Sequence, residues 1–308
     1  MSAIEVTDQE ISLVGPILQR LLWADNETRA KIQKFGVNVL STNFYSNTPS
    51  IEEIENSYEY TTNDPPYLNS QIFDQKKFHK TLEEIIKYSS EFNPPIDGDE
   101  ENCQGFFWKN SMFSYSDAMS YYCFVRMLRP KNIVEIGSGF STLVALEAIE
   151  KNKSGKVHSF EPFPREFLRK DDRIDLHAVK AQDISSEFLN DILQDNDILF
   201  IDSTHTVKTG SDCLHIYLRL LPQVKRNIFV HVHDIFLPFG MPQHWLLDHQ
   251  YFWTEQYLLL AFLVDNSKAS VCYGSHYNAK WNPSLMQKFM GEKYPFGGGS
   301  LWFEYNAK

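Results

Sequence analysis

The chain has 308 residues, of which 43% are hydrophobic and 14% aromatic, enough for one large domain or one domain with a smaller cap. A net charge of −11 argues against nucleic-acid binding, because phosphate contacts need clustered Lys and Arg. The four cysteines are scattered without a CxxC pair, and we find no signal peptide and no apolar run of membrane length. We therefore expect a cytoplasmic protein with free thiols and no membrane contact.

The first hundred residues read as helices and loops. Thr7 followed by Glu10 forms a capping-box pattern before a run of apolar residues at helical spacing. Similar patterns predict a helix over 27–40, a polar and aromatic loop over 41–70 and a helix over 74–92. The acidic, Pro-rich stretch 93–102 is typical of a linker. We expect residues 1–105 to form a helical subdomain, either a cap over a substrate or a unit that only packs, and 106–308 to form the main domain.

After a helix over 115–128, strands and helices alternate. Apolar runs predict strands over 133–136, 157–160, 174–179, 197–201, 228–232, 269–273 and 300–305. Helical spacing predicts helices over 141–149, 167–170, 186–193, 210–221 and 254–264. Alternation of this kind favours an α/β fold with a doubly wound, mostly parallel sheet and right-handed crossovers.

The stretch 132–142, NIVEIGSGFST, joins the first of these strands to a helix through a glycine turn. Gly137 and Gly139 allow a sharp turn and close approach of a ligand, and the helix start behind them offers free N–H groups. Thr142 stands where a dinucleotide-binding GxGxxG has its last glycine, so a pyrophosphate fits less well. Glu135 suits a cationic ligand, such as the amino-acid end of S-adenosylmethionine (SAM). A simple tight turn is the alternative.

Acidic residues follow the successive strands, and ligands of such sheets lie beyond the carboxyl ends of parallel strands. These acids are Glu135, Glu161, Asp183, Asp202 and Asp234. With roughly a quarter of residues charged, about one or two would be expected by chance. Glu161 comes 24 residues after Gly137, where an acid commonly accepts hydrogen bonds from ribose hydroxyls. An exposed Glu before Pro162 is the alternative.

Histidines accompany two of these strand ends. His205 follows Asp202 by three residues, and His233 directly precedes Asp234. A histidine titrates near neutral pH and is suited to take a proton from a hydroxyl or amine, so His205 is the candidate general base, with Asp202 and His233 as further catalytic candidates. Alternatively, His205 is an ordinary surface-loop histidine. His231 and His233 point the same way if the strand is regular.

The E-x-G-x-G turn and the strand-end acids over 132–234 resemble those of class I SAM-dependent methyltransferases, and the D-x-x-H and HD pairs resemble a branch acting on small molecules such as sugars or natural products. The resemblance implies a seven-stranded Rossmann-like sheet. It also implies donor-binding positions, with Asp183 at the adenine unless it only caps a helix: Glu135, Gly137, Ser138, Gly139, Ser141, Glu161, Asp183 and Asp202.

In some such relatives, acids at the fourth and fifth strand ends bind magnesium, which holds two substrate oxygens and lowers their pKa. Asp202 and Asp234 match those positions. His233 stands where those relatives carry Asp or Glu, and imidazole suits Fe, Mn or Zn better than Mg²⁺. The residues therefore leave two questions open: whether a divalent metal binds at Asp202 and Asp234, and which metal it is.

These residues predict a SAM-dependent methyltransferase that moves a methyl group to an O or N atom of a small-molecule acceptor. Two alternatives remain open at this point. One is an NAD-dependent oxidoreductase on a similar sheet, and the other is a SAM-binding regulatory protein without catalysis.

Overall fold

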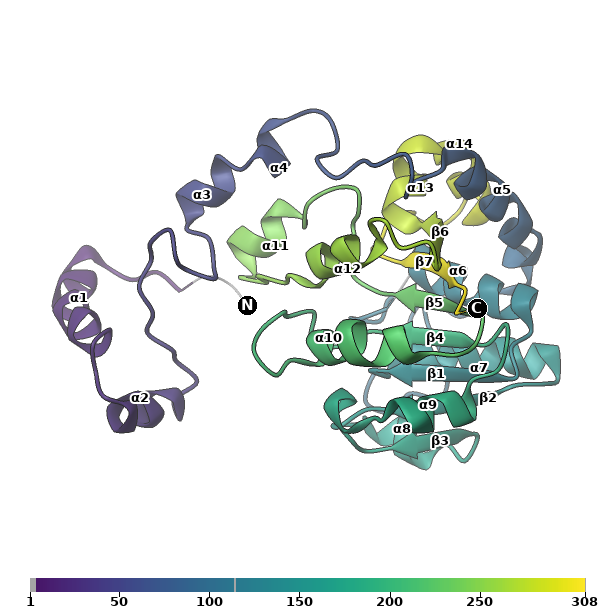
Figure 1. Ribbon diagram of the computed structural model, residues 1–308, viewed down its shortest axis with the longest axis horizontal. Coiled ribbons are helices and arrows are strands. Elements are labelled where there is room, and N and C mark those ends of the chain that lie inside the picture. The colour runs from purple at the N-terminus through teal and green to yellow at the C-terminus, as the bar shows by residue number, and fades with distance from the viewer. Residues whose placement is uncertain (1–3, 114, 308) are drawn as a thin grey trace. The chain divides into compact units, whose positions relative to one another are not determined.

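The computed structural model describes residues 4–113 and 115–307 (Figure 1). Contacts divide the chain into two compact units, and the division lies between Ser57 and Tyr58. The smaller unit is helical, and the larger unit holds the sheet. Among the residues described, no helix combines the length and the apolar character needed to cross a membrane.

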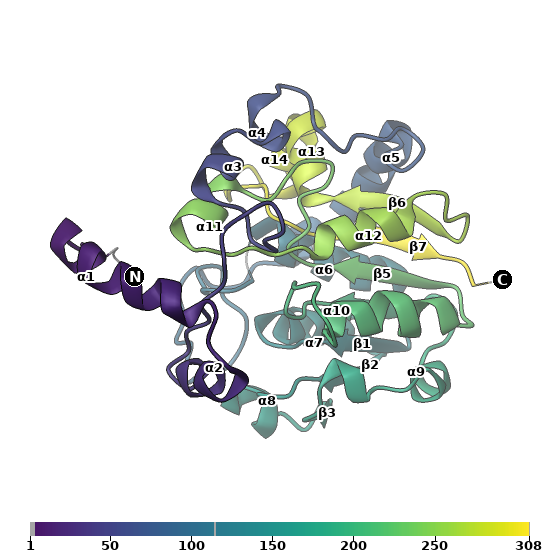
Figure 2. The same cartoon turned by 60° about the vertical axis from the view of Figure 1, so that its left-hand side comes forward.

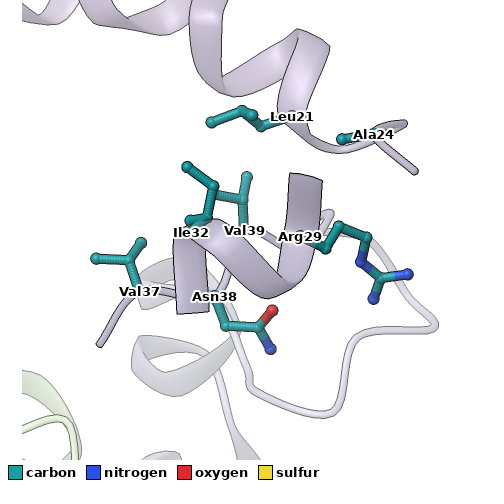
Figure 3. A pocket seen from close by; sticks show the side chains of 7 residues that line it. All are labelled: Leu21, Ala24, Arg29, Ile32, Val37, Asn38 and Val39. Atoms are coloured by element: carbon teal, nitrogen blue, oxygen red, sulfur yellow. The ribbon is translucent and has the colours of Figure 1, made fainter. Parts of the chain in front are cut away.

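Over its described residues, 4–57, the smaller unit contains three helices: α1 (Asp8–Leu21), α2 (Asn26–Gln33) and α3 (Ile51–Glu55). The capping box of Thr7 and Glu10 forms at the start of α1, as predicted. The helix expected over 27–40 is shorter, and α3 lies inside the stretch predicted to be a loop. No described residue of α1 or α2 is buried, and the apolar side chains between them enclose a hollow of only about 10 Å³ (Figure 3).

The predicted domain boundary after residue 105 lies too far along the chain. The helix α5 (Gln75–Ile85) buries Phe78, Leu82 and Ile85 within the larger unit, and the 3₁₀ helix η1 (Ile86–Glu91) continues it. Apolar burial of this extent makes the segment part of the sheet domain.

The larger unit is built on a seven-stranded sheet with the order β3-β2-β1-β4-β5-β7-β6. Its strands are β1 (Asn132–Ile136), β2 (Lys156–Phe160), β3 (Ile174–His177), β4 (Ile198–Ile201), β5 (Ile228–Val232), β6 (Ala269–Gly274) and β7 (Leu301–Tyr305). The first five are parallel, and β7 runs antiparallel to both of its neighbours. The predicted α/β class and mostly parallel seven-stranded sheet are confirmed.

Helices cover both faces of this sheet (Figures 1 and 2). Those that the sequence predicts include α6 (Tyr115–Leu128), α7 (Phe140–Asn152), α8 (Glu166–Lys170), α9 (Ser186–Ile192) and α12 (Glu255–Leu263). The helix expected over 210–221 is broken into α10 (Asp212–His215), the π-helical η3 (Ile216–Leu220) and the 3₁₀ turn η4 (Leu221–Gln223). Helices that the sequence pattern did not reveal are α4 (Tyr58–Thr61), α11 (Gln243–Asp248), α13 (Ser275–Trp281) and α14 (Pro283–Phe289).

Two hydrophobic cores result, one on each face of the sheet. Ile133 of β1 joins the core that contains α6 and α7, whereas Val134 and Ile136 join the core that contains η3. This alternation follows the two-residue period of a strand. Glu135 shares its face with Ile133 and is directed toward α6 and α7. The carboxyl ends of β1, β2, β4 and β5 meet at one edge, where a ligand of such a sheet binds.

Candidate active site

The two glycines of the turn after β1 have different structural roles. Gly137 has a φ of +87°, and a Cβ on it would overlap the backbone carbonyl of Asp202. This glycine is therefore required by the neighbouring strand β4, whatever the ligand. A Cβ on Gly139 would meet nothing within 4 Å, so the second glycine faces open space. That space is where a ligand can approach the N-terminus of α7.

Glu135 is fully buried just before this turn. Its carboxylate accepts hydrogen bonds from the Tyr121 hydroxyl at 2.9 Å and the Thr142 hydroxyl at 2.5 Å. Burial raises the pKa of Glu135 to about 7, although both hydroxyls act in the opposite direction. The Thr142 hydroxyl also accepts a hydrogen bond from the backbone N–H of Gly139. Thr142 thus links the turn to Glu135, which a third glycine at this position would not do.

Glu161 of the β2 end lies at the same turn. Its Oε2 atom is 3.4 Å from the backbone nitrogen of Ser138, and its Oε1 accepts from the backbone N–H of Phe163. Ser141 is buried in the first turn of α7, whereas Asp183 is exposed at the end of a 3₁₀ turn, η2 (Ala181–Asp183). The structure therefore brings Glu161 to the glycine turn.

Six ionisable side chains gather beyond β4 and β5, and we call them the central cluster. Its members are Asp117, Asp202, His205, His233, Asp234 and Glu255. His205 and His233 each lie between carboxylates, and His205 and Asp234 both have positive φ of 56°. Backbone conformations of this kind cost energy and concentrate at functional sites.

His205 is held at both ring nitrogens. Its Nδ1 lies 2.7 Å from Glu255 Oε2, and its Nε2 lies 3.2 Å from Asp202 Oδ1. Its backbone carbonyl accepts hydrogen bonds from the N–H groups of Thr254 and Glu255 at the start of α12. Glu255, 1% exposed, also accepts a hydrogen bond from the Tyr217 hydroxyl at 2.8 Å. The insertion after β5 thus fixes a histidine of the loop after β4.

His233 is also shared between carboxylates. Its Nδ1 lies 3.4 Å from Asp202 Oδ1 and 3.6 Å from Asp234 Oδ2, and its Nε2 lies 3.6 Å from Asp117 Oδ2. Asp117 in turn accepts hydrogen bonds from the backbone N–H groups of Gly299 and Ser300. Through Asp117, the glycine-rich segment before β7 is tied to the cluster.

The carboxylates make both histidines strongly basic. Burial opposes protonation of His205, but Asp202 and Glu255 outweigh it and raise its pKa to about 10. The pKa of His233 lies well above its usual value, because Asp234, Asp202 and Asp117 overcome the effect of burial. Burial works against ionisation of Asp202, yet the two histidines hold its pKa well below the usual range, whereas burial raises the pKa of Asp234. The carboxylates therefore favour the protonated form of both imidazoles.

Comparison with protein families adds a decisive observation. A family described as a methyltransferase domain matches residues 134–235, which run from β1 to just past β5. The matched stretch holds the glycine turn, Glu161, Asp202, His205 and the His233–Asp234 pair. Residues 134–235 of the chain are therefore similar to a methyltransferase domain.

Individual relatives of the methyltransferase domain are more distant. An uncharacterized protein of Archaeoglobus fulgidus is 34% identical over 133 residues, which are 41% of this chain and 59% of that protein. The chain therefore spans less than two thirds of that relative's length. A methyltransferase from Podospora anserina bound to S-adenosylhomocysteine (SAH) is 20% identical. Its TM-score is 0.42 over 73% of this chain and 88% of that one. A SAM-bound O-methyltransferase of tomaymycin synthesis from Streptomyces achromogenes is 13% identical, with a TM-score of 0.43 over 74% and 90%.

The predicted metal ligands of the methyltransferase domain fit a magnesium ion poorly. Ligand atoms of Asp202, His233 and Asp234 lie within 4.8 Å of one another. However, protonated imidazoles already occupy the space between the carboxylates, with His205 Nε2 at 3.2 Å from Asp202 and 3.6 Å from Asp234. Two cations at such distances compete with a metal, and imidazole is not a ligand that Mg²⁺ prefers. We therefore derive no step through a metal at this site.

A cavity of about 260 Å³ adjoins the cluster, and His233 and Asp234 form part of its wall. Aromatic side chains supply much of the remainder: Tyr115, Phe236, Trp245 and Phe296. Asp117 and the three glycines 297–299 also line it. The cavity thus joins apolar, flat surfaces to the charged end of β5.

The sequence patterns did not indicate two members of the central cluster, Asp117 and Glu255. Asp117 and Glu255 stand in the first turns of otherwise apolar helices, where an acid ordinarily complements the helix dipole. His231 points the same way as His233, as predicted, and both rings contact Phe113. It is a core residue: its Nε2 bonds the Ser300 hydroxyl, it stacks on Trp302, and burial lowers its pKa well below the usual value.

Proposed function

We propose that the protein transfers the methyl group of SAM to an oxygen or nitrogen atom of a small molecule held in the cavity beside His233 and Asp234. The observation that supports this most is the open space at Gly139, bordered by Glu161, at the carboxyl edge of a methyltransferase sheet. A cofactor lying there would point its sulfonium toward the ends of β4 and β5, where Asp202 and Asp234 stand.

Charge supports a cationic donor. In the central cluster the four carboxyl groups outnumber the two histidines, so a negative balance remains even when both imidazoles are protonated. A sulfonium, which loses its charge during transfer, is attracted to such a site. We assign Glu161 to the ribose and Asp183 to the adenine, with Glu135, Gly137, Ser138, Gly139, Ser141 and Asp202 as the other donor-binding positions.

The size and lining of the cavity support a compact acceptor. Its volume of about 260 Å³ is below the roughly 300–1,000 Å³ of ordinary ligand pockets. Aromatic walls favour a flat or apolar body, and the polar end of the cavity favours a hydroxyl or amine. The methyl carbon forms a bond to the acceptor atom while its bond to sulfur breaks, so alignment of the two is the main demand on the protein.

The acceptor's proton requires a base, and we propose Asp234 for this step. Asp234 lines the cavity, and burial raises its pKa, so its carboxylate binds a proton more readily than an ordinary aspartate. His205, with a pKa of about 10, is already protonated at neutral pH and is not among the residues lining that cavity. The sequence prediction of His205 as the base holds only if activity rises with pH toward 10. Otherwise His205 orients Asp202 and Asp234.

Calorimetric titration of the full chain with S-adenosylhomocysteine, the product of SAM, tests the donor site. We expect wild-type protein to bind it and Glu161→Ala to bind at least about tenfold more weakly, through loss of the ribose hydrogen bonds. Glu166→Ala is the matched control, because Glu166 is an exposed glutamate five residues away on α8. Lack of binding to both SAM and its product, with binding of NAD, would support an oxidoreductase instead.

Transfer itself is measured with labelled SAM and a panel of small phenols, alcohols and amines. Asp234→Asn keeps the size of the side chain but removes its basicity, and we expect turnover to fall about 10²–10⁴-fold while product binding persists. Binding without turnover on any acceptor would favour the non-catalytic regulatory alternative.

The buried, free cysteines agree with a reducing, cytoplasmic setting.

A further inference from the structure

A second group of histidine and carboxylate side chains lies on β2 and β3, the strands at one end of the sheet. His158 of β2 lies opposite Asp175 of the edge strand β3, and His177 follows two residues later on the same face. His158 Nδ1 is 2.9 Å from Asp175 Oδ2, and His177 Nε2 is 3.4 Å from Asp175 Oδ1. We call these three residues the edge cluster; one ligand atom from each lies within 4.8 Å of the others.

The side chain of Asn132 determines which nitrogen of His158 carries its proton. The Asn132 amide nitrogen donates to the Ile192 carbonyl and to Asp197 Oδ2, so its oxygen is the atom that faces His158 Nε2 at 3.2 Å. The reverse amide orientation would set oxygen against two oxygens. His158 Nε2 therefore donates its hydrogen to Asn132, and in a neutral ring Nδ1 is left with a bare lone pair.

That lone pair points at a carboxylate, which also offers only lone pairs. Two acceptors at 2.9 Å require a positive centre between or beside them. A ligating histidine in metal sites has the same arrangement: one nitrogen faces the metal, and the other donates to an amide or carboxyl oxygen that fixes the ring.

His177 supplies an independent indication. Its Nε2 atom is buried and makes no hydrogen bond within the part of the chain that the structure describes. The ring is fixed by stacking on Phe160, with centroids 4.6 Å apart, and by an edge contact with Phe188 at 5.6 Å. A ring nitrogen held in this way toward Asp175, with no hydrogen-bonding partner, is available as a ligand.

We propose that His158 Nδ1, a carboxylate oxygen of Asp175 and His177 Nε2 bind a divalent transition-metal ion of the zinc class, with solvent at the remaining position. Two imidazoles with one carboxylate are donors that suit Zn²⁺ and its neighbours rather than Mg²⁺ or Ca²⁺. Ligands about 2.0–2.1 Å from a tetrahedral ion lie about 3.3–3.4 Å apart. The two histidines face different oxygens of Asp175, at 2.9 Å for His158 Nδ1 and 3.4 Å for His177 Nε2, and one ligand atom of each residue lies within 4.8 Å of the others, so binding one ion requires a small rotation of these side chains. None of the three ligands is among the residues assigned to the methyl donor or to the acceptor, although the His177 carbonyl accepts a hydrogen bond from the backbone N–H of Glu161.

Two cations compete with the metal. Lys156 Nζ lies 3.2 Å from Asp175 Oδ2, but its side chain is 54% exposed and free to turn into solvent. A second proton on His158 would satisfy its contact with Asp175. It would leave His177 Nε2 without a partner, whereas one metal ion serves all three groups.

Calorimetric titration of the full chain with zinc chloride tests the proposal, with melting temperature as a second readout. We expect wild-type protein to bind zinc, and His177→Ala and Asp175→Asn to lose one site or weaken it at least tenfold. Both positions are partly exposed, and circular dichroism of the metal-free variants verifies that they fold. His249→Ala replaces an exposed histidine directly after α11, and this matched control should bind zinc as wild type does.

Four results would overturn the proposal. Wild-type protein could show no zinc binding, or His177→Ala could bind zinc as wild type does. Alternatively, the loss could occur in Asp234→Asn, which would assign the ion to the central cluster, or in His249→Ala, which would assign it to the surface.

Discussion

The central cluster and the edge cluster combine the same side chains in different proportions. In the central cluster each histidine has carboxylates at both ring nitrogens, which favour the protonated form of both rings, and the four carboxyl groups still outnumber the two histidines. In the edge cluster two histidines share Asp175, and the Asn132 side chain accepts a hydrogen bond from His158 Nε2. The number of hydrogen-bond acceptors around an imidazole, rather than the presence of histidine, therefore decides whether the ring acts as a cation or as a ligand.

The largest expected effect comes from removing the most buried carboxylate of the central cluster. In Glu255→Ala, protonated His205 and the Tyr217 hydroxyl both lose their partner, and breaking a buried ion pair costs about 3–5 kcal/mol of the free energy of unfolding. Urea denaturation monitored by circular dichroism measures it. Glu166→Ala, which removes an exposed i,i+4 pair with Lys170, should cost under about 0.5 kcal/mol. Equal costs would mean that His205 carries no buried charge.

The next effect separates the two glycines of the turn. Gly137→Ala places a Cβ on the carbonyl of Asp202 at a positive φ, and we expect a loss of about 2–4 kcal/mol in unfolding free energy. Gly139→Ala meets nothing nearby, so stability should stay within about 0.5 kcal/mol. Its affinity for S-adenosylhomocysteine should nevertheless fall, because the new methyl group points into the proposed donor space. Unchanged affinity in a folded Gly139→Ala variant would move the donor elsewhere.

Part of the fold and of the candidate site can be predicted from the sequence. The seven strands are predictable because each is a short apolar run in a regular alternation, and the strand-end acids mark the shared edge of the sheet. Glu161 and Asp202 are found in this way. The helices α13 and α14 are not, because their 275–289 segment mixes aromatic, amide and proline residues without a clear apolar face.

The pairings within the two clusters require the folded chain. Glu255 lies 50 positions after His205, and no local pattern joins them. Asp175 reaches His158 only through the register of β2 with β3, which the sequence does not specify. The proton state of His205 follows from these distant partners. For that reason a histidine that suits a general base by its position has, in the structure, a raised pKa.

A smaller expected effect is the pH dependence of stability, which tests the protonation of His205. The pKa of His205 is raised to about 10 from an ordinary 6.5, so its contribution to stability is fully present below about pH 6.5 and is lost as pH rises through 10. The stability difference between wild type and His205→Gln should therefore shrink by about 2 kcal/mol across this range, less than the full shift because neighbouring groups adjust their own protonation. Denaturant titrations at several pH values measure it. A constant difference would indicate a neutral His205.

The smallest expected effect concerns Lys156, whose ammonium group competes with the metal at the edge cluster. Lys156 and Asp175 form a pair whose side chains are 54% and 37% exposed, and pairs of this kind contribute at most about 0.5–1 kcal/mol. Lys156→Ala should therefore leave the metal-free unfolding free energy nearly unchanged. It should raise zinc affinity by roughly two- to fivefold, because the metal no longer displaces the ammonium group. Lys170→Ala, which removes another exposed lysine, is the control in the same calorimetric titration. If Lys156→Ala instead weakened zinc binding, Asp175 would need the lysine to hold its position, and the edge cluster would be an ion-pair network like the central one.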